Sequence, residues 1–195
     1  MAAPRKDNVK ELIIDAAETL LAAKKLSDIS LAEIAATAGI SKGTLYYHYK
    51  TKNDILLDLT DKYLDEQYND LIVWTEDASK DTSLHRLVKY ILERDISTAG
   101  MRLHLFYDAM LGNEKIRNRL LDRYREFAAV ISEKIGERTD KLPADYCAWL
   151  LLLLSDGLFI HQTLDNRQLD TADFISQTEN YIKNFKHPET EKIQR

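Results

Sequence analysis

The chain has 195 residues, of which 45% are hydrophobic and 30% are charged, and this composition suits a globular protein of one or two domains. Six glycines and three prolines are too few for an all-β fold, and the single cysteine, Cys147, excludes an intramolecular disulfide and fits a reducing cytoplasm. The net charge is −5, with +2 over residues 1–52 (eight basic, six acidic) and −7 over residues 53–195 (nineteen basic, twenty-six acidic). The overall acidity therefore does not exclude nucleic-acid binding by the N-terminal part.

The first predicted helix covers about residues 9–21, where apolar residues recur at the spacing of an amphipathic helix. Two later helix starts follow from capping chemistry, because Ser30 and Thr51 are each followed three positions later by an acidic residue. Between these two starts, Gly39 ends one short helix and Ser41 is suited to cap the next. Two short helices joined by a tight turn have the arrangement of a helix-turn-helix.

The second helix of this helix-turn-helix lies in a window, residues 34–53, that contains no acidic residue, three lysines, and three tyrosines around a histidine. Lysine can pair with a phosphate or a guanine edge, threonine can contact a thymine methyl or a phosphate, and tyrosine and histidine can donate to phosphate oxygens. A glycine lets the helix lie close in the groove. We therefore predict DNA contacts at Lys42, Gly43, Thr44, Tyr46, Tyr47 and His48. Leu45 and Tyr49 are expected to be buried beneath this helix.

The run AEIAATAGISKGTLYYHYKTKNDIL, residues 32–56, resembles the DNA-binding signature of the tetracycline-repressor (TetR) family of bacterial regulators nearly position by position. The resemblance implies recognition-helix contacts at the six positions just given, and a phosphate contact at Lys52, which opens the following helix. One departure is the sequence Lys-Lys-Leu at residues 24–26, where many members have a glycine at the end of the first helix. Beyond about residue 56 the resemblance is one of layout only.

Helical periodicity continues to the end of the chain, with no convincing strand, and predicts an all-α fold of about nine helices. A long helix should run from Lys52 to about residue 74, with its apolar side inward at Ile55, Leu56, Leu59, Tyr63 and Leu71. Further helices are predicted near residues 84–91, 103–111, 116–135, 143–164 and 174–185, and Pro143 is expected to be the first helical residue of its helix. We expect a DNA-binding domain over residues 1–52 and a helical ligand-binding and dimerisation domain over residues 53–195, with no linker between them.

The helix that starts at Pro143 is apolar around most of its circumference, whereas a helix on the surface of a monomer should keep one polar face. We therefore expect one side to face the domain core and the other to pack, together with the last helix, against a second subunit. The resemblance implies a four-helix interface of this kind. The interface residues predicted are Gly157, Phe159, Phe174 and Tyr181.

Aromatic side chains with a few polar partners are scattered over the second domain, and such mixtures line ligand pockets as well as fill cores. The candidates for a small-molecule pocket are Tyr68, Tyr90, His104, Tyr107, Asp108, Tyr124, Phe127, Trp149 and Asp156. Histidines 85, 104 and 161 are interpreted as surface or hydrogen-bonded residues and not as metal ligands, so no metal and no cofactor is expected.

No Gly-x-Ser-x-Gly, His-Glu-x-x-His or phosphate-loop motif is present, so we do not expect an enzyme. The N-terminal residues are polar and the longest apolar run covers only residues 148–154, so we expect neither secretion nor membrane insertion but a cytoplasmic protein. The sequence predicts a homodimeric transcriptional regulator, most readily a repressor, that binds a palindromic double-stranded DNA operator and is released by a small-molecule effector. The alternative is a DNA-bound interaction protein whose second domain only dimerises or binds a protein partner.

Overall fold

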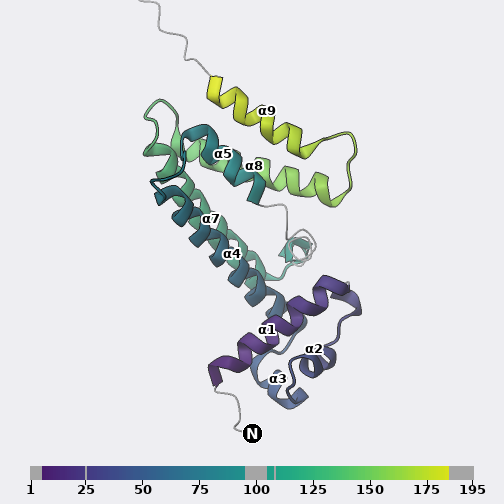
Figure 1. The fold of residues 1–195 in the computed structure, drawn as a ribbon. Helices are drawn as coiled ribbons and strands as arrows, with labels where there is room; N and C mark the ends of the chain where they lie inside the picture. The colour runs from purple at the N-terminus through teal and green to yellow at the C-terminus, as the bar shows by residue number, and fades with distance from the viewer. Residues whose placement is uncertain (1–5, 25, 95–104, 108, 185–195) are drawn as a thin grey trace, which may run out of the picture. The chain divides into compact units, whose positions relative to one another are not determined.

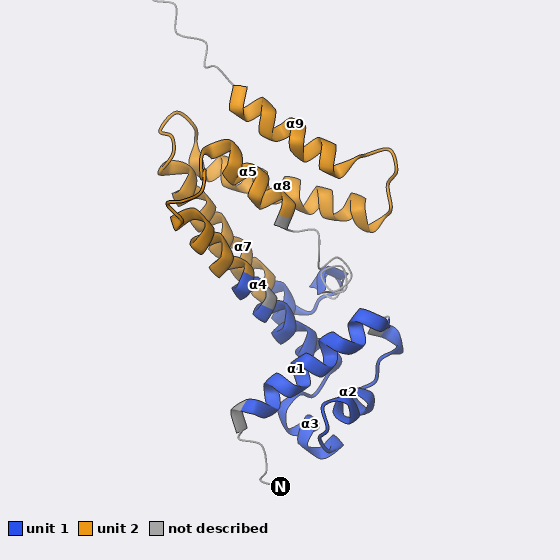
Figure 2. Ribbon diagram, viewed as in Figure 1, with its two compact units in different colours: residues 1–66, 101–118 blue, residues 67–100, 119–195 orange. Residues whose placement is uncertain are grey.

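The computed structural model describes residues 6–24, 26–94, 105–107 and 109–184. The chain divides into two compact units, which are described separately: unit 1 comprises residues 1–66 and 101–118, and unit 2 comprises residues 67–100 and 119–195 (Figure 2). All regular secondary structure among the described residues is helical, which confirms the predicted all-α fold.

Unit 1 begins with α1 (Lys6–Ala23), a 3-10 helix η1 (Leu26–Asp28), α2 (Leu31–Thr37) and α3 (Lys42–His48), followed by the first part of α4 (Lys52–Glu76) (Figure 1). One apolar core joins these elements. Its buried residues are Val9, Ile13, Ile14, Ala16, Ala17, Ile29, Ile34, Ala35, Leu45, Tyr49, Ile55 and Leu59. The predicted apolar side of the first helix and the predicted burial of Leu45 and Tyr49 are therefore confirmed.

Unit 2 contains the rest of α4 and helices α5 (Leu84–Arg94), α7 (Glu114–Gly136), α8 (Ala144–Thr163) and α9 (Thr171–Asn184), the first five residues of α7 belonging to unit 1. Helix α5 packs against both α8 and α9 because its buried side chains, Leu87, Val88, Ile91 and Leu92, recur along one face. The buried carboxylate of Glu179 on α9 accepts bonds from Arg86, at 2.9 Å, and from Lys89, at 3.1 Å, so the α5–α9 contact also carries an ion-pair network.

The predicted helix boundaries are close to those observed, with two differences. Pro143 is the N-cap of α8 and not its first helical residue: its backbone is extended, with ψ of 94°, and its carbonyl accepts the first helical bond, from the Cys147 amide. The helix predicted over residues 103–111 lies partly outside the described residues, and residues 105–107 and 109–110 of it are helical.

Helix α8 has two apolar faces, as the sequence predicted, but only one is buried within unit 2. Ala148, Leu151, Leu152, Leu158 and Phe159 pack inside the unit. Tyr146, Leu150, Leu153, Ile160 and Leu164 remain 41 to 70% exposed along the opposite face. By length and composition this is the one helix of the described ranges that could cross a membrane. Its buried face and its hydrogen-bonded Asp145 and Asp156 fit a core helix with a further apolar surface.

Candidate nucleic-acid interface

The turn between α2 and α3 depends on the backbone conformation of Gly39. Its φ of +67° lies in the left-handed region, which strains residue types other than glycine, asparagine and aspartate. The Gly39 amide donates to the Ala36 carbonyl at 3.1 Å, and the Ile40 amide donates to the Ala35 carbonyl at 3.0 Å. This bond pair is the Schellman motif that ends many helices. The predicted end of the first short helix is confirmed, and α3 starts at a fixed angle to α2.

Helix α3 is fixed at its start by a side-chain cap and along its length by one buried residue. The Ser41 hydroxyl accepts a 3.0 Å bond from the Thr44 amide and lies 2.8 Å from the Thr44 hydroxyl, which confirms the predicted N-cap. Leu45 is fully buried. Because Leu45 faces the core, the side chains of Lys42, Tyr46 and Tyr47 are left on the outside, with Tyr47 67% exposed.

The two remaining polar candidates on α3, Thr44 and His48, are half-buried. The His48 ring lies edge to face with that of Tyr47, with 5.1 Å between ring centres. The six α3 candidates thus occupy one short helix, although Thr44 also serves the cap and His48 also packs on its neighbour. Their contacts with DNA stay a prediction.

Gly43 has no structural role inside the protein that a larger residue would disturb. A Cβ placed there would meet only the Ser41 Oγ, at 3.7 Å, which is ordinary van der Waals contact. Glycine inside a helix is also less stable than alanine by about 0.5–1 kcal/mol. The exposed position of Gly43 on α3 therefore fits a requirement from outside the protein, such as close approach to a nucleic-acid backbone.

Tyr49, directly after α3, ties this helix to two others. Its hydroxyl donates a 2.9 Å bond to Asp58 on α4, and the ammonium group of Lys10 on α1 lies 5.5 Å from the centre of its ring and 3.5 Å from Asp58. Burial, and then the bond to Asp58, raises the pKa of the Tyr49 phenol well above its usual value. The Tyr49 hydroxyl is therefore a neutral donor inside the fold and acts as an anchor for α3.

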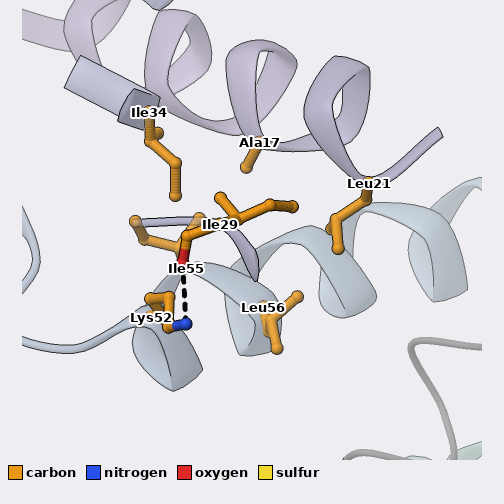
Figure 3. Close-up of a pocket in the computed structure, with 7 residues that line it drawn as sticks. All are labelled: Ala17, Leu21, Ile29, Ile34, Lys52, Ile55 and Leu56. Atoms are coloured by element: carbon orange, nitrogen blue, oxygen red, sulfur yellow. Dashed lines mark hydrogen bonds between the residues drawn. The ribbon is translucent and has the colours of Figure 1, made fainter. Parts of the chain in front are cut away.

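The start of α4 combines a capping box with a second anchor. Thr51 and Asp54 exchange bonds in both directions, with the Asp54 amide donating to the Thr51 hydroxyl at 3.1 Å and the Thr51 amide donating to the Asp54 carboxylate at 3.2 Å, which confirms the predicted cap. The Lys52 ammonium group donates a 2.7 Å bond to the Ile29 carbonyl (Figure 3). Lys52 thus holds the segment before α2 against α4. Its phosphate contact stays a prediction.

Lys52 also lines a small apolar pocket in unit 1. The other lining residues are Ala17, Leu21, Ile29, Ile34, Ile55 and Leu56, which come from α1, α2, α4 and the segment before α2 (Figure 3). Most of these residues belong to the core of the unit, so the pocket is a packing gap beneath the helix-turn-helix. It is separate from the aromatic residues predicted to bind a ligand.

The charges around α3 support an anion-binding surface. Asp54, the first acidic residue after the acid-free window, is paired with Lys115 at 2.7 Å. Glu33, the last acidic residue before the window, is paired with Lys24. Lys50, which is not among the predicted contacts, is exposed and donates to the Tyr46 carbonyl at 2.6 Å, at the end of α3. Lys50 lies inside the acid-free window, and this is the sequence signal that could have identified it as a further contact.

The aromatic pocket candidates of unit 2 form two groups. In one, the Tyr124 ring stacks on Trp149 with 6.5 Å between centres, the Tyr124 hydroxyl donates to Asp156 at 2.6 Å, and the rings of Tyr68 and Phe127 lie edge to face at 6.1 Å. In the other, Tyr90 stacks on Trp74 at 4.5 Å. Tyr107 is 57% exposed and belongs to unit 1. His104 and Asp108 lie outside the described residues.

The four predicted interface residues differ in exposure. Tyr181 on α9 is 69% exposed, and Gly157 and Phe174 are half-buried. Phe159 is only 2% exposed, so its ring packs within unit 2. The place of all four residues in an interface stays a prediction, and the periodicity of a helix that is apolar on two sides does not tell which side is the core.

Comparison with known proteins gives both sequence relatives and structural neighbours. Residues 13–59 match the sequence profile of the bacterial regulatory proteins of the tetR family. The nucleoid occlusion factor SlmA of Shewanella loihica is 30% identical over 169 residues, which cover 80% of this chain and 84% of that protein. The HTH-type transcriptional regulator BetI of Klebsiella pneumoniae is 26% identical over 181 residues, which cover 88% and 90%.

Two solved structures share the fold. A transcriptional regulator from Saccharomonospora viridis in complex with choline has a TM-score of 0.75 at 20% identity and covers 92% of this chain and 97% of that one. The regulator FadR from Bacillus subtilis in complex with stearoyl-CoA has a TM-score of 0.64 at 17% identity and covers 91% and 99%. One fold thus accommodates a small cation in the first protein and a long acyl thioester in the second.

Proposed function

We propose a function for this chain, which belongs to the TetR family of bacterial DNA-binding transcriptional regulators. It acts in the cytoplasm as a dimeric repressor, and a small molecule releases it from its operator. The observation that carries this proposal is the outer face of α3. It presents Lys42, Tyr46 and Tyr47 to the exterior, next to a glycine that the fold itself does not require.

On DNA, α3 enters the major groove as the recognition helix of a helix-turn-helix. Lys42 then pairs with a phosphate or a guanine edge, while the tyrosine hydroxyls and His48 donate to phosphate oxygens. Lys50 and Lys52, at the end of α3 and the start of α4, add positive charge beside the same backbone. The position of α3 is fixed by the Ser41 cap, by the anchor at Tyr49 and by the bond from Lys52 to the Ile29 carbonyl.

The dimer uses the exposed apolar face of α8 together with α9. Tyr146 and Leu153 on α8 are 65 and 66% exposed, Leu164 at its C-cap is 70% exposed, and Tyr181 on α9 is 69% exposed. A continuous apolar stripe of this kind is costly in water and marks an interaction surface. A twofold dimer places two recognition helices on successive half-sites of a palindromic operator, about one turn of DNA, roughly 34–36 Å, or a small multiple of it apart.

Release by a ligand requires that the ligand prefer the DNA-free conformation. Helix α4 begins at the DNA-binding unit and ends in unit 2, so a change in its position can link the two functions. A ligand that weakens DNA binding a hundredfold must prefer the DNA-free state by about 2.7 kcal/mol, and DNA must weaken ligand binding equally. The structural neighbours that bind choline and stearoyl-CoA support a small-molecule ligand for this fold, but two such different ligands do not define the effector of this chain.

The test is a selection of bound sequences from randomised duplex DNA, followed by measurement of stoichiometry. The proposal expects an inverted repeat bound by two protomers. Recovery of sites without twofold symmetry, bound by one protomer, would contradict the dimeric operator. Screening small molecules for release of the selected duplex then tests the effector.

A second candidate function is supported by the similarity to SlmA, which is named as a nucleoid occlusion factor. In this alternative, the DNA-bound dimer uses unit 2 to bind a protein partner and needs no effector. A protein that binds a selected duplex, but whose DNA affinity responds to no small molecule in a broad screen, would favour it.

A further inference from the structure

Five side chains from three helices make two sets of contacts inside unit 2. Tyr68 is on α4, Tyr124 and Phe127 are one turn apart on α7, and Trp149 and Asp156 are two turns apart on α8. Ring contacts join Tyr68 to Phe127 and Tyr124 to Trp149, and a 2.6 Å hydrogen bond joins Tyr124 to Asp156. The arrangement therefore brings one carboxylate to the edge of an aromatic group.

Tyr124 links Trp149 and Asp156 because it contacts both α8 residues at once. Its ring stacks on that of Trp149, with 24° between the ring planes, while its hydroxyl donates to the carboxylate of Asp156. Since Trp149 and Asp156 lie seven residues apart, they share one face of α8. The carboxylate is thus fixed on the same side of the helix as the indole ring.

Trp149 lies at the edge of the apolar α8 face assigned above to the dimer, one turn from Leu153. Its side chain is 44% exposed, whereas the rings that fill the core of this unit, Phe127 and Phe159, are 9% and 2% exposed. Tyr124 and Asp156 are half-buried. An indole at the edge of this face, beside a half-buried carboxylate, offers a surface that a small molecule can reach from outside the interface.

The chemistry of this surface favours a positive ligand. Aromatic faces carry negative electrostatic potential and attract cations, particularly quaternary ammonium groups, and a neighbouring carboxylate adds a formal negative charge. An anionic group at the same place would be repelled by the carboxylate and by the negative potential of the ring faces.

We propose that Tyr124, Trp149 and Asp156 form the subsite for the cationic head of an organic ammonium ligand. The inference rests on the proposed function, because it names the chemical class of the effector that unit 2 binds. The aromatic rings contact the alkyl groups of the ammonium, Asp156 supplies the opposite charge, and Tyr124 positions Asp156.

The first experiment uses the two tryptophans of the chain as separate reporters. Trp74→Phe leaves Trp149 as the only indole, and Trp149→Phe leaves Trp74, which is stacked on Tyr90. Tetramethylammonium chloride should change the fluorescence of Trp149 in a saturable manner. tert-Butanol, a neutral molecule of similar size, and sodium chloride at equal concentration should not, and Trp74 should report no such binding curve.

The second experiment measures tetramethylammonium affinity by calorimetry in the absence of DNA. Asp156→Asn keeps the size of the side chain and removes its charge, and it should weaken binding about tenfold, which corresponds to about 1.4 kcal/mol. The matched control is Asp145→Asn, on the same helix but bonded to Ser132, and its affinity should be unchanged. If Asp156→Asn fails to fold, Trp149→Leu at the exposed ring replaces it and should weaken binding to a similar extent.

Three results would overturn the assignment: tert-butanol binding as well as tetramethylammonium, a response at Trp74 equal to that at Trp149, or equal affinities of the Asp156→Asn variant and the wild type. These outcomes are distinct from failure of the proposed function. Cation binding at Trp149 without any effect on DNA affinity would support the subsite and contradict release by its ligand. Release of DNA by other molecules, with no cation bound, would do the reverse.

Discussion

The Asp54 carboxylate accepts a 2.7 Å hydrogen bond from the Lys115 ammonium group, although 61 positions separate the two residues. Asp54 also closes the capping box of α4 with Thr51. One carboxylate therefore secures the first turn of α4 and joins it to the first turn of α7, and both turns belong to unit 1. The residue that follows the cap is Lys52, so this junction lies beside the proposed DNA-binding surface.

The ion pair makes the stability of this junction dependent on pH. The hydrogen bond from Lys115 lowers the pKa of Asp54 below its usual value, and the bonds from Thr51 act in the same direction. Burial opposes this shift but does not cancel it. A depressed pKa stabilises the fold above the unfolded-state pKa, near 3.9, and this stabilisation disappears as the pH falls through the folded-state pKa. Asp54→Ala should therefore lower the free energy of unfolding by about 0.5–2 kcal/mol at pH 7, mainly through loss of the cap.

Urea unfolding of the wild type and of Asp54→Ala at pH 7 and near pH 3 checks this expectation, and the difference between them should shrink at the lower pH. Lys115→Ala is the control, because it removes the ion pair and leaves the capping box. Since Lys115 is 68% exposed, its replacement should cost only about 0–1 kcal/mol. An Asp54→Ala difference that grows on acidification would refute the assignment.

Gly43→Ala should separate stability from DNA binding. The added methyl meets only Ser41, at 3.7 Å, and alanine favours the helix by about 0.5–1 kcal/mol, so the melting temperature should stay level or rise. The same methyl should obstruct the approach of α3 to DNA and reduce affinity by about tenfold or more, which is about 1.4 kcal/mol or more. Fluorescence anisotropy with the selected duplex measures this reduction.

Gly136→Ala is the matched control, because a Cβ at this position in unit 2 meets nothing within 4 Å. It should leave DNA affinity unchanged. If Gly43→Ala binds DNA as tightly as this control does, α3 does not lie in the groove as proposed.

Lys42 and Lys52 should respond differently to replacement by alanine. Lys42 is exposed, so Lys42→Ala should weaken DNA binding without a change in stability. The salt slope should fall by about one for each phosphate that the lysine no longer neutralises, or about two per dimer. Lys52→Ala should reduce the slope in the same way. It should also destabilise unit 1 by about 0.5–1.5 kcal/mol, because it removes the bond to the Ile29 carbonyl.

Affinity measured over a series of salt concentrations, with thermal unfolding in parallel, checks both expectations. Lys80→Ala is the control, because Lys80 lies in unit 2 and pairs with Asp77 at 3.1 Å. A salt slope of Lys42→Ala equal to that of Lys80→Ala would remove Lys42 from the phosphate-binding residues.

The features that the sequence predicted correctly are local ones. The caps at Ser30, Ser41 and Thr51 each depend on groups within three residues, and the left-handed Gly39 depends on the end of a single helix. Such interactions follow from residue type and spacing, with no knowledge of how distant segments pack.

The interactions that the sequence did not predict are those between distant segments. Lys52 reaches Ile29 across 23 positions, and Asp54 reaches Lys115 across 61. Neither pair has a periodic pattern, because each depends on how whole helices pack. The sequence also did not tell which side of α8 is the core, since both sides are apolar and hydropathy cannot distinguish the core from an interface.

Leu153→Glu should dissociate the proposed dimer. Leu153 is 66% exposed in the single chain, so the substitution should leave the fold of the protomer intact, whereas an unpaired charge buried between subunits costs about 3–5 kcal/mol. Gln162→Glu adds the same charge at an exposed position away from the apolar stripe of α8 and is the control. Light scattering at micromolar concentration should give a monomer for Leu153→Glu and a dimer for the control.

The Leu153→Glu monomer should also bind the full palindrome more weakly than the control does, because α3 is unchanged but the second recognition helix is no longer tethered to it. A wild type that is itself monomeric at this concentration would reject the α8 interface.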